Sequence, residues 1–289
     1  MSVNSSSKFD LDRIGGRGAL YELITEMIGA GEDALQQFRA GVVSNFQMKP
    51  DAVNSPLTAA DQLVERRLRR FLAKRFPDVG FLGEETGLSE PEGCEMRFVV
   101  DPIDGTRSFI RGLRGWAVLV GLEADGEPVV GVAYMPVSSD LYLAVKGEGT
   151  LANGRPVHVS GVNSLASALL LHGGLNQFTT MGMEQLLVDI GNKSYSQRGF
   201  ADFGGYRTVM HGRADAMIDP GVQPWDICAP AVLIREAGGV LTSFEGEQTI
   251  YGGNALVSNG LLHEQLLEII RGAQVRPSGD PRARKSDIP

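Results

Sequence analysis

The sequence has little of what disulfide-rich, zinc-binding and membrane-spanning proteins need. Its 289 residues include two cysteines, Cys94 and Cys228, which are far apart and form no ligand-spaced pair, so neither a disulfide framework nor a zinc site is indicated. No stretch approaches the roughly 18 consecutive apolar residues of a membrane span. The polar start, residues 1–10, lacks the apolar core of a signal peptide. These absences predict a cytoplasmic protein without a membrane partner.

Positive charge is also in short supply. Lys and Arg number 27 against 35 Asp and Glu, which gives a formal net charge of −8 and a pI near 5.1. Such a surface repels a nucleic-acid backbone unless a local basic patch intervenes. The basic run within residues 66–75 has the spacing of the outer face of an amphipathic helix, so we interpret it as solvated. No nucleic-acid partner is expected.

The hydrophobic pattern predicts helices first, then strands, then both in alternation. Apolar residues recur at helical spacing over residues 20–28 and 63–76, the second run behind a possible N-cap at Thr58. Short strands with one turn at Asp125-Gly126 follow, at residues 98–100, 117–123, 128–134 and 141–145. The later helices are expected at residues 183–190, 203–211, from Trp225 and at 262–271. The later strands are expected at residues 214–218, 240–243 and 255–258.

This order of elements favours a layered α+β fold. We expect one domain over residues 1–276, built from two closely joined sub-regions of about residues 11–160 and 161–276. Residues 277–289 are polar and rich in proline and charge, so a mobile tail is expected there.

Acidic residues gather where the predicted elements end. They lie in four stretches: Thr58-Ala59-Ala60-Asp61, Gly83-Glu84-Glu85, Asp101-Pro102-Ile103-Asp104-Gly105-Thr106 and Trp225-Asp226. Asp101 directly follows an apolar run, which places it at the carboxyl end of a strand. Two aspartates three residues apart on a tight loop can aim oxygens at one point, with the Ile103 carbonyl as a neutral ligand. Hard oxygen donors select Mg²⁺, Mn²⁺ or Ca²⁺.

The residues after the second aspartate suit a phosphate group. Gly105 and Thr106 offer backbone N–H groups as the chain turns away, and the Thr106 hydroxyl can orient a water. Each stretch alone also has a plain structural explanation. Asp226 can be an N-cap, Thr58 and Asp61 a capping box, and the glycine-containing stretches ordinary turns. Their conjunction is far more specific than any one of them.

Together these stretches resemble the inositol monophosphatase superfamily, whose signature combines the acidic GEE turn, the D-P-I-D-G-T loop and a W-D helix start followed by E-A-G-G. The similarity covers about residues 17–272. It implies an αβαβα sandwich of the inositol monophosphatase / fructose-1,6-bisphosphatase type that works as a homodimer. It also implies Mg²⁺-dependent hydrolysis of a small phosphate monoester by metal-activated water, with two or three Mg²⁺ per site that Mn²⁺ can replace.

The resemblance also assigns roles residue by residue. It implies that Glu84, Asp101 and the Ile103 carbonyl hold a first metal and that Asp101, Asp104 and Asp226 hold a second. Asp61 and Glu84 would assist a third, weaker site. Thr106, with Glu84 or Asp61 behind it, would position the attacking water, so these three residues are the expected catalytic groups. The first sub-region then carries the metal loops, and the second the substrate cap and the last metal ligand.

The segments outside the metal loops look more like the histidinol-phosphate phosphatase branch. Ser108-Phe109 stands where inositol enzymes usually have Asn-Phe, and residues 199–206 add to the likeness. L-Histidinol phosphate, an intermediate of histidine biosynthesis, is therefore the favoured substrate. Inositol 1-phosphate or a broad range of sugar and polyol phosphates is the alternative.

The expected substrate-binding residues follow from that resemblance and from charge: Asp104, Gly105, Thr106, Arg107, Asp202, Tyr206 and Asp219. Asp219 stands where inositol enzymes carry a Glu that contacts sugar hydroxyls. Asp202 and Asp219 would stabilise the cationic end of histidinol phosphate, and Tyr206 or Trp116 would pack on its ring. Asp202 can equally cap a helix that starts at Phe203. Arg107 and Arg111 either contact phosphate or lie on the dimer surface.

Two hypotheses of another class compete with this one. An EF-hand starting at Asp101 fails on register, because Ile103 and Gly112 stand where Asp or Asn and Glu are needed. A catalytically silent metal-binding relative is the second, and the presence of every expected carboxylate argues against it.

Overall fold

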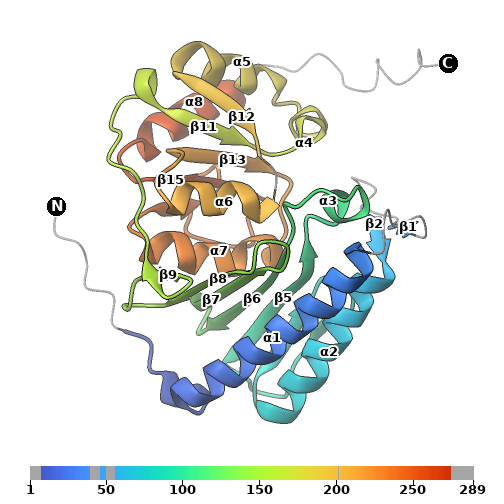
Figure 1. Ribbon diagram of the computed structural model, residues 1–289. Helices are drawn as coiled ribbons and strands as arrows, with labels where there is room; N and C mark the ends of the chain where they lie inside the picture. The colour runs from blue at the N-terminus through green and yellow to red at the C-terminus, as the bar shows by residue number, and fades with distance from the viewer. Residues whose placement is uncertain (1–7, 40–45, 50–55, 201, 275–289) are drawn as a thin grey trace. The chain divides into compact units, whose positions relative to one another are not determined.

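The computed structural model describes residues 8–39, 46–49, 56–200 and 202–274. Within them the chain forms two compact units (Figure 1). Of the described residues, unit 1 comprises those within 1–157, 202–204 and 224–237, and unit 2 comprises those within 158–200, 205–223 and 238–274. The mobile tail expected at residues 277–289 lies outside the described residues.

Unit 1 is a mixed sheet with helices on both faces. Its helical elements are η1 (Leu11–Ile14), α1 (Gly16–Arg39), α2 (Ala59–Arg75), α3 (Thr106–Ile110) and α7 (Pro224–Glu236). Its strands are β1 (Phe46–Met48), β2 (Pro56–Thr58), β3 (Gly80–Gly83), β4 (Gly87–Ser89), β5 (Met96–Asp104), β6 (Ala117–Ala124), β7 (Glu127–Met135), β8 (Asp140–Val145), β9 (Thr150–Ala152) and β10 (Arg155–Pro156). Strands β3 to β10 form one sheet in the order β10-β9-β8-β7-β6-β5-β3-β4, in which only β3 and β5 pair in parallel.

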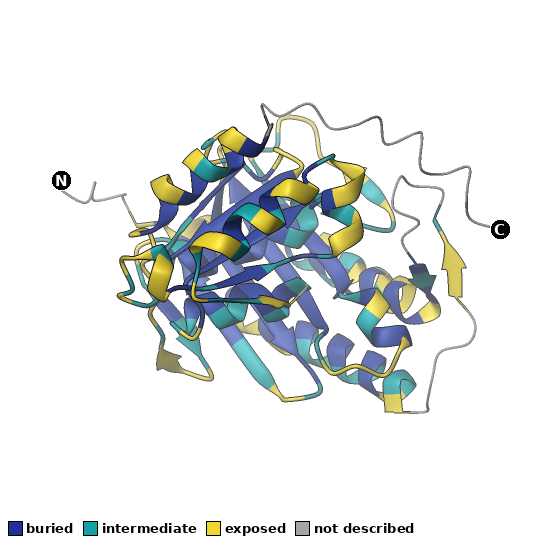
Figure 2. Cartoon of the chain, turned by 90° about the horizontal axis from the view of Figure 1, so that it is seen from above, coloured by how far each residue is buried: buried dark blue, intermediate teal, exposed yellow. Residues whose placement is uncertain are grey.

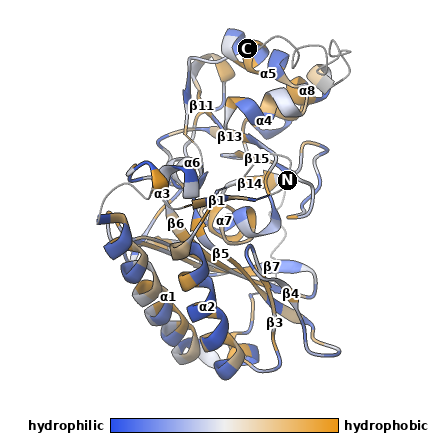
Figure 3. Cartoon of the chain, turned by 90° about the vertical axis from the view of Figure 1, so that its right-hand side faces the viewer, coloured by the Kyte–Doolittle hydropathy of each residue, from blue (hydrophilic) through white to orange (hydrophobic). Residues whose placement is uncertain are grey.

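The two early helices confirm the periodicity in the sequence. The Thr58 side chain accepts from the amides of Ala60 and Asp61, and the Asp61 carboxylate accepts from the Thr58 amide, so α2 begins with a complete capping box. The buried stripe of α2 passes through Val64, whereas Leu63 is 38% exposed. The predicted stripe was therefore misplaced by one residue at that point. Figure 3 shows the hydrophilic outer faces of α1 and α2.

Strand β5 runs further than the sequence predicted. Asp101 pairs with Leu119 and Asp104 with Ala117, so the register shifts between the two aspartates. The expectation that the strand ends at Asp101 and a loop follows was wrong. Proline has no N–H to donate to the ladder at position 102, and the Ile103 amide donates instead to Asp101 Oδ1 at 3.0 Å. The result is a β-bulge within the strand, which changes the directions in which the Asp101 and Asp104 side chains leave it.

Helix α7 lies on the face of the sheet opposite α1 and α2, and two glycines let it approach. A Cβ on Gly131 of β7 would lie 2.4 Å from the Ala229 carbonyl oxygen, and one on Gly121 of β6 would meet Cys228 Sγ at the same short range. The other face of β7 carries Val130, Val132 and Tyr134 in the core beneath α1 and α2. The sheet is accordingly buried between helices, as Figure 2 shows by the colour of its strands.

Unit 2 is a smaller layered unit. Its sheet has the order β12-β11-β13-β15-β14, with β11 parallel to β12 and β13 and the remaining pairs antiparallel. The strands are β11 (Leu169–His172), β12 (Ser196–Gly199), β13 (Ala216–Pro220), β14 (Val240–Thr242) and β15 (Asn254–Ser258). The helices are η2 (Leu165–Ser167), α4 (Leu175–Thr180), α5 (Glu184–Lys193), α6 (Asp202–Met210, whose first three residues belong to unit 1) and α8 (His263–Gln274). Side chains of α4, α5 and α8 share one core with Ala216 and Ile218, and Gly205 of α6 packs on Met217, which faces the other way.

The predicted strands at 98–145 and the later helices and strands were confirmed, with ends shifted by a few residues. Eight strands (β1 to β4 and β9 to β12) and the short helices η1, η2, α3 and α4 had not been predicted. Among the described residues, none of the helices combines the length and apolar character that crossing a membrane requires.

Gly131→Ala should destabilise the protein. The added methyl has to displace the α7 backbone at Ala229, and overpacking of this kind costs about 1–3 kcal/mol. Urea denaturation followed by circular dichroism measures the loss. Gly191→Ala is the matched control, because a Cβ there meets nothing within 4 Å and alanine favours the interior of α5. Equal stability of the two variants would contradict the tight seating of α7.

Candidate active site

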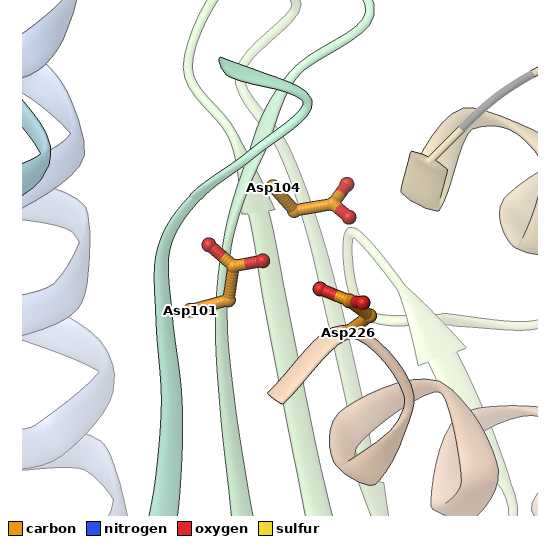
Figure 4. A group of neighbouring side chains, drawn as sticks. All are labelled: Asp101, Asp104 and Asp226. Carbon is orange, nitrogen blue, oxygen red and sulfur yellow. The ribbon is translucent and has the colours of Figure 1, made fainter. Parts of the chain in front are cut away.

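Three aspartates from two elements of unit 1 converge on one point. Asp101 and Asp104 come from the bulged end of β5, and Asp226 comes from the first turn of α7. Each offers a carboxylate oxygen, and these oxygens all lie within 4.8 Å of one another. Figure 4 shows the three carboxylates turned toward a common space. Asp101 and Asp104 are buried and Asp226 is half-buried.

The negative charge of the three aspartates would be balanced by a bound cation. Burial, followed by the charges of Glu84, Asp104, Asp226 and Asp61, raises the pKa of Asp101 well above its ordinary value. Close carboxylates repel one another unless a cation neutralises them. The three donors are all oxygens, which suits a hard divalent cation such as Mg²⁺. The residues present therefore fit the metal that the resemblance implies.

The turn after β3 brings two further carboxylates, held by a lysine. Lys49 Nζ lies 2.7 Å from Glu84 Oε1 and 2.7 Å from Glu85 Oε1. Burial opposes the charge of Lys49, but Glu84 and Glu85 outweigh it and raise the pKa of the ammonium. Burial raises the pKa of Glu85 to about 7, against the lowering effect of Lys49. The predicted ligand Glu84 is thus half-buried and ion-paired.

Asp61 and Thr106 form a buried pair beside the bulge. Asp61 Oδ2 accepts from the Thr58 amide at 2.7 Å and from its hydroxyl at 2.6 Å. The Thr106 hydroxyl has one hydrogen, for which Asp61 Oδ1 at 3.1 Å and the Ile103 carbonyl at 3.0 Å are both acceptors. Burial, partly offset by the Thr58 hydrogen bonds, raises the pKa of Asp61 to about 6. Asp61 therefore serves both as the helix cap and as the partner of Thr106.

Asp104 also fixes the start of α6. The Phe203 amide donates to Asp104 Oδ2 at 2.7 Å. Asp202 has a φ of +61° and its carboxylate lies against Gly105, where a Cβ would be 2.9 Å from Asp202 Oδ2. Burial raises the pKa of Asp202 to about 6, while the charge of Arg107 lowers it. Asp202 thus stands beside Gly105, the N-cap of the helix α3 that carries Arg107.

The remaining predicted substrate residues are a pair in unit 2. The Tyr206 hydroxyl donates to Asp219 Oδ2 at 2.7 Å, and both residues are buried. Gly173 leaves room for Asp219, because a Cβ there would clash with its Oδ1. Trp116 is fully buried and packs against Phe109 with ring centroids 5.0 Å apart. Neither aromatic ring suggested for stacking on the substrate is exposed.

Sequence reasoning missed two charged residues around the acidic turn, Lys49 and Glu65. Lys49 bridges Glu84 and Glu85, and the Glu85 amide donates to Glu65 Oε2 at 2.8 Å. A signal for Glu65 existed: it falls on the buried stripe of α2, next to Val64 and one turn before Leu68, where an apolar residue is expected. No pattern in the sequence marks Lys49, whose role depends on the pairing of β1 with β2.

The arrangement can hold divalent cations and orient a water. Oxygens from β5 and α7 would surround a cation. The Thr106 hydroxyl donates its one hydrogen to Asp61 or to the Ile103 carbonyl, which leaves its lone pairs to accept from a water. Such a centre suits the hydrolysis of a phosphate ester, which depends on charge neutralisation and positioning.

Comparisons with known proteins agree with this chemistry. The sequence model of the inositol monophosphatase family matches residues 19–274. The histidinol-phosphatase of Mycobacterium tuberculosis is 37% identical over 241 residues, which are 81% of this chain and 92% of the relative. The inositol-1-monophosphatase of Mesorhizobium japonicum is 31% identical over 261 residues, 88% of this chain and 97% of the relative.

A solved structure carries the same fold. The extragenic suppressor protein suhB from Bartonella henselae superimposes with a TM-score of 0.79 at 28% identity, over 88% of this chain and 98% of that one. This likeness confirms the predicted layered α+β fold. The chain belongs to the inositol monophosphatase family, whose members are phosphoric monoester hydrolases.

Proposed function

We propose that this protein hydrolyses a small phosphate monoester with Mg²⁺ as its cofactor, and that L-histidinol phosphate is its substrate. The observation that carries the proposal is the convergence of Asp101, Asp104 and Asp226 within 4.8 Å. Three oxygen donors at that spacing suit a hard divalent cation that also has oxygens of the substrate to bind.

The proposed roles of the residues combine the family resemblance with the contacts of the side chains. Asp101 and Asp104 would hold cations from β5, Asp226 from α7 and Glu84 from the turn after β3. Bound divalent cations neutralise the phosphate and make a nearby water more acidic. Thr106 would accept a hydrogen bond from the attacking water while its own hydroxyl donates to Asp61 or the Ile103 carbonyl. The new bond joins the water oxygen to phosphorus as the ester bond breaks, and the released alcohol takes up a proton.

The histidinol proposal rests on similarity and charge. The relative named histidinol-phosphatase is 37% identical to this chain, against 31% for the one named inositol-1-monophosphatase. Histidinol phosphate carries an ammonium and an imidazole, and the carboxylates of Asp202 and Asp219 are suited to a cation. Inositol offers hydroxyls only.

Inositol 1-phosphate is the second candidate. Asp219 already accepts a hydrogen bond from Tyr206, and a carboxylate in such a network can also accept from substrate hydroxyls. A metal-dominated site recognises chiefly the phosphate, so activity on several alcohol phosphates is compatible with it.

Asp101→Asn should lower turnover by more than about a hundredfold in saturating Mg²⁺. Loss of a residue that only supports a ligand costs 10- to 100-fold, and a ligand placed between two cations should cost more. Phosphate release in Mg²⁺ and in EDTA measures the effect. Asp78→Asn, an exposed carboxylate outside the cluster, is the control. Near-normal turnover of Asp101→Asn would rule out the metal assignment.

Phosphate release from L-histidinol phosphate and myo-inositol 1-phosphate should differ in kcat/KM by about tenfold or more in favour of histidinol phosphate. One well-made hydrogen bond to a charged group contributes about 1.5–3 kcal/mol, which is sufficient for that ratio. Parallel assays at the same Mg²⁺ concentration give the comparison. A preference for the inositol ester would replace the first substrate with the second candidate.

Asp219→Asn should raise the KM for histidinol phosphate by about tenfold, because the amide loses the charge that attracts the substrate cation. The asparagine oxygen can still accept from Tyr206, so hydrolysis of an aryl phosphate should change little. Tyr206→Phe is the matched variant that keeps the carboxylate and removes only the hydrogen bond. Equal losses on both substrates in Asp219→Asn would mean that Asp219 is structural.

A further inference from the structure

A buried carboxylate outside the predicted site supports the acidic turn. Glu65 lies on α2 and is 0% exposed. Its Oε2 accepts from the Glu85 amide at 2.8 Å. Its Oε1 is buried and has no hydrogen-bond partner among the described residues. Glu65 thus holds the backbone of the turn that carries Glu84 and Glu85, at the expense of one unsatisfied oxygen.

A carboxylate at this position lowers the stability of the folded protein. The neighbours of Glu65 on the buried stripe of α2 are Val64 and Leu68, both fully buried. A buried charged or polar group without full hydrogen bonding costs several kcal/mol relative to an apolar side chain that fills the same space. A leucine at position 65 would continue the buried apolar stripe of α2, so packing alone does not explain a carboxylate there.

The strand that leads into the turn is fitted around this carboxylate. A Cβ on Gly83, the last residue of β3, would lie 2.6 Å from Glu65 Cδ and 2.7 Å from its Oε1. The next amide, that of Glu84, donates to the Val100 carbonyl of β5 at 3.2 Å. Consecutive amides of the turn are therefore fastened to two elements, Glu84 to β5 and Glu85 to α2.

We propose that Glu65 is a positioning residue for the metal centre: by holding the Glu85 amide, it sets the direction in which the Glu84 side chain leaves the turn. Glu84 acts on the same cluster, since its charge contributes to the raised pKa of Asp101. Residues that orient metal ligands without touching the ion typically change metal affinity by 10- to 100-fold when replaced. This inference rests on the proposed function, because it takes Glu84 as a ligand.

The test compares Mg²⁺ binding with folding in three variants. Glu65→Leu fills the space but cannot accept a hydrogen bond, so the dissociation constant for Mg²⁺, measured by isothermal titration calorimetry, should rise at least about tenfold. Its melting temperature in EDTA should equal or exceed that of the parent. Glu65→Gln keeps an acceptor for the Glu85 amide and should bind Mg²⁺ within about threefold of the parent, a difference below the range for lost supporting contacts.

A third variant reaches the same contact without changing Glu65. Gly83→Ala pushes against the Glu65 carboxylate and the Phe81 ring and should also weaken Mg²⁺ binding. In every variant with weakened binding, the half-saturating Mg²⁺ concentration for turnover should rise while kcat at saturating Mg²⁺ stays close to that of the parent. Glu123→Gln is the control, because Glu123 is a buried carboxylate on β6 paired with Arg97 at 3.8 Å. It should alter stability without altering Mg²⁺ affinity.

Mg²⁺ affinity of Glu65→Leu equal to that of the parent would overturn the proposal, whether or not its melting temperature is lowered. If Glu65→Leu does not fold, Gly83→Ala decides in the same way. Failure of the parent protein to bind Mg²⁺ or to release phosphate would instead count against the proposed function, so the two failures are distinguishable.

Discussion

The mutual repulsion of buried carboxylates is the constraint on which the centre of unit 1 depends. Asp101, Asp104 and Asp226 hold their oxygens within 4.8 Å of one another, and burial raises the free energy of each additional negative charge. The chain counters this with local donors: the Ile103 amide on Asp101, the Phe203 amide on Asp104 and the Lys49 ammonium on Glu84. A divalent cation would complete that compensation where amides and a single lysine cannot.

The sequence predicted the clustering of Asp101, Asp104 and Asp226 better than the backbone conformation that brings them together. The proximity of Asp101 to Asp104 followed from their spacing, and the arrival of Asp226 followed from the resemblance. The bulge did not, because an apolar run followed by a proline is also typical of a strand that simply ends. Only the pairing of Asp104 with Ala117 shows that β5 continues through the cluster.

The parts of the fold that escaped prediction are those whose reasons lie elsewhere in the chain. Strand β12 reads Ser-Gln-Arg-Gly and has no apolar alternation, yet it pairs with β11 at the edge of its sheet. No residue near Lys49 in the sequence indicates an ion pair. Glu65 is one of many charged residues on α2, so its charge alone does not distinguish it. Such features depend on tertiary pairing, which periodicity does not report.

Helix α7 joins the cluster of aspartates to the packing of the sheet. Its first turn supplies Asp226, and the next turn, at Cys228 and Ala229, lies against Gly121 and Gly131. A cation held by Asp226 together with the β5 aspartates would therefore tie helix and sheet to each other as a cross-link does. A ligand that binds only the native state stabilises it by RT ln(1 + [L]/Kd). The melting temperature of the protein should therefore rise with the concentration of free cation in its surroundings.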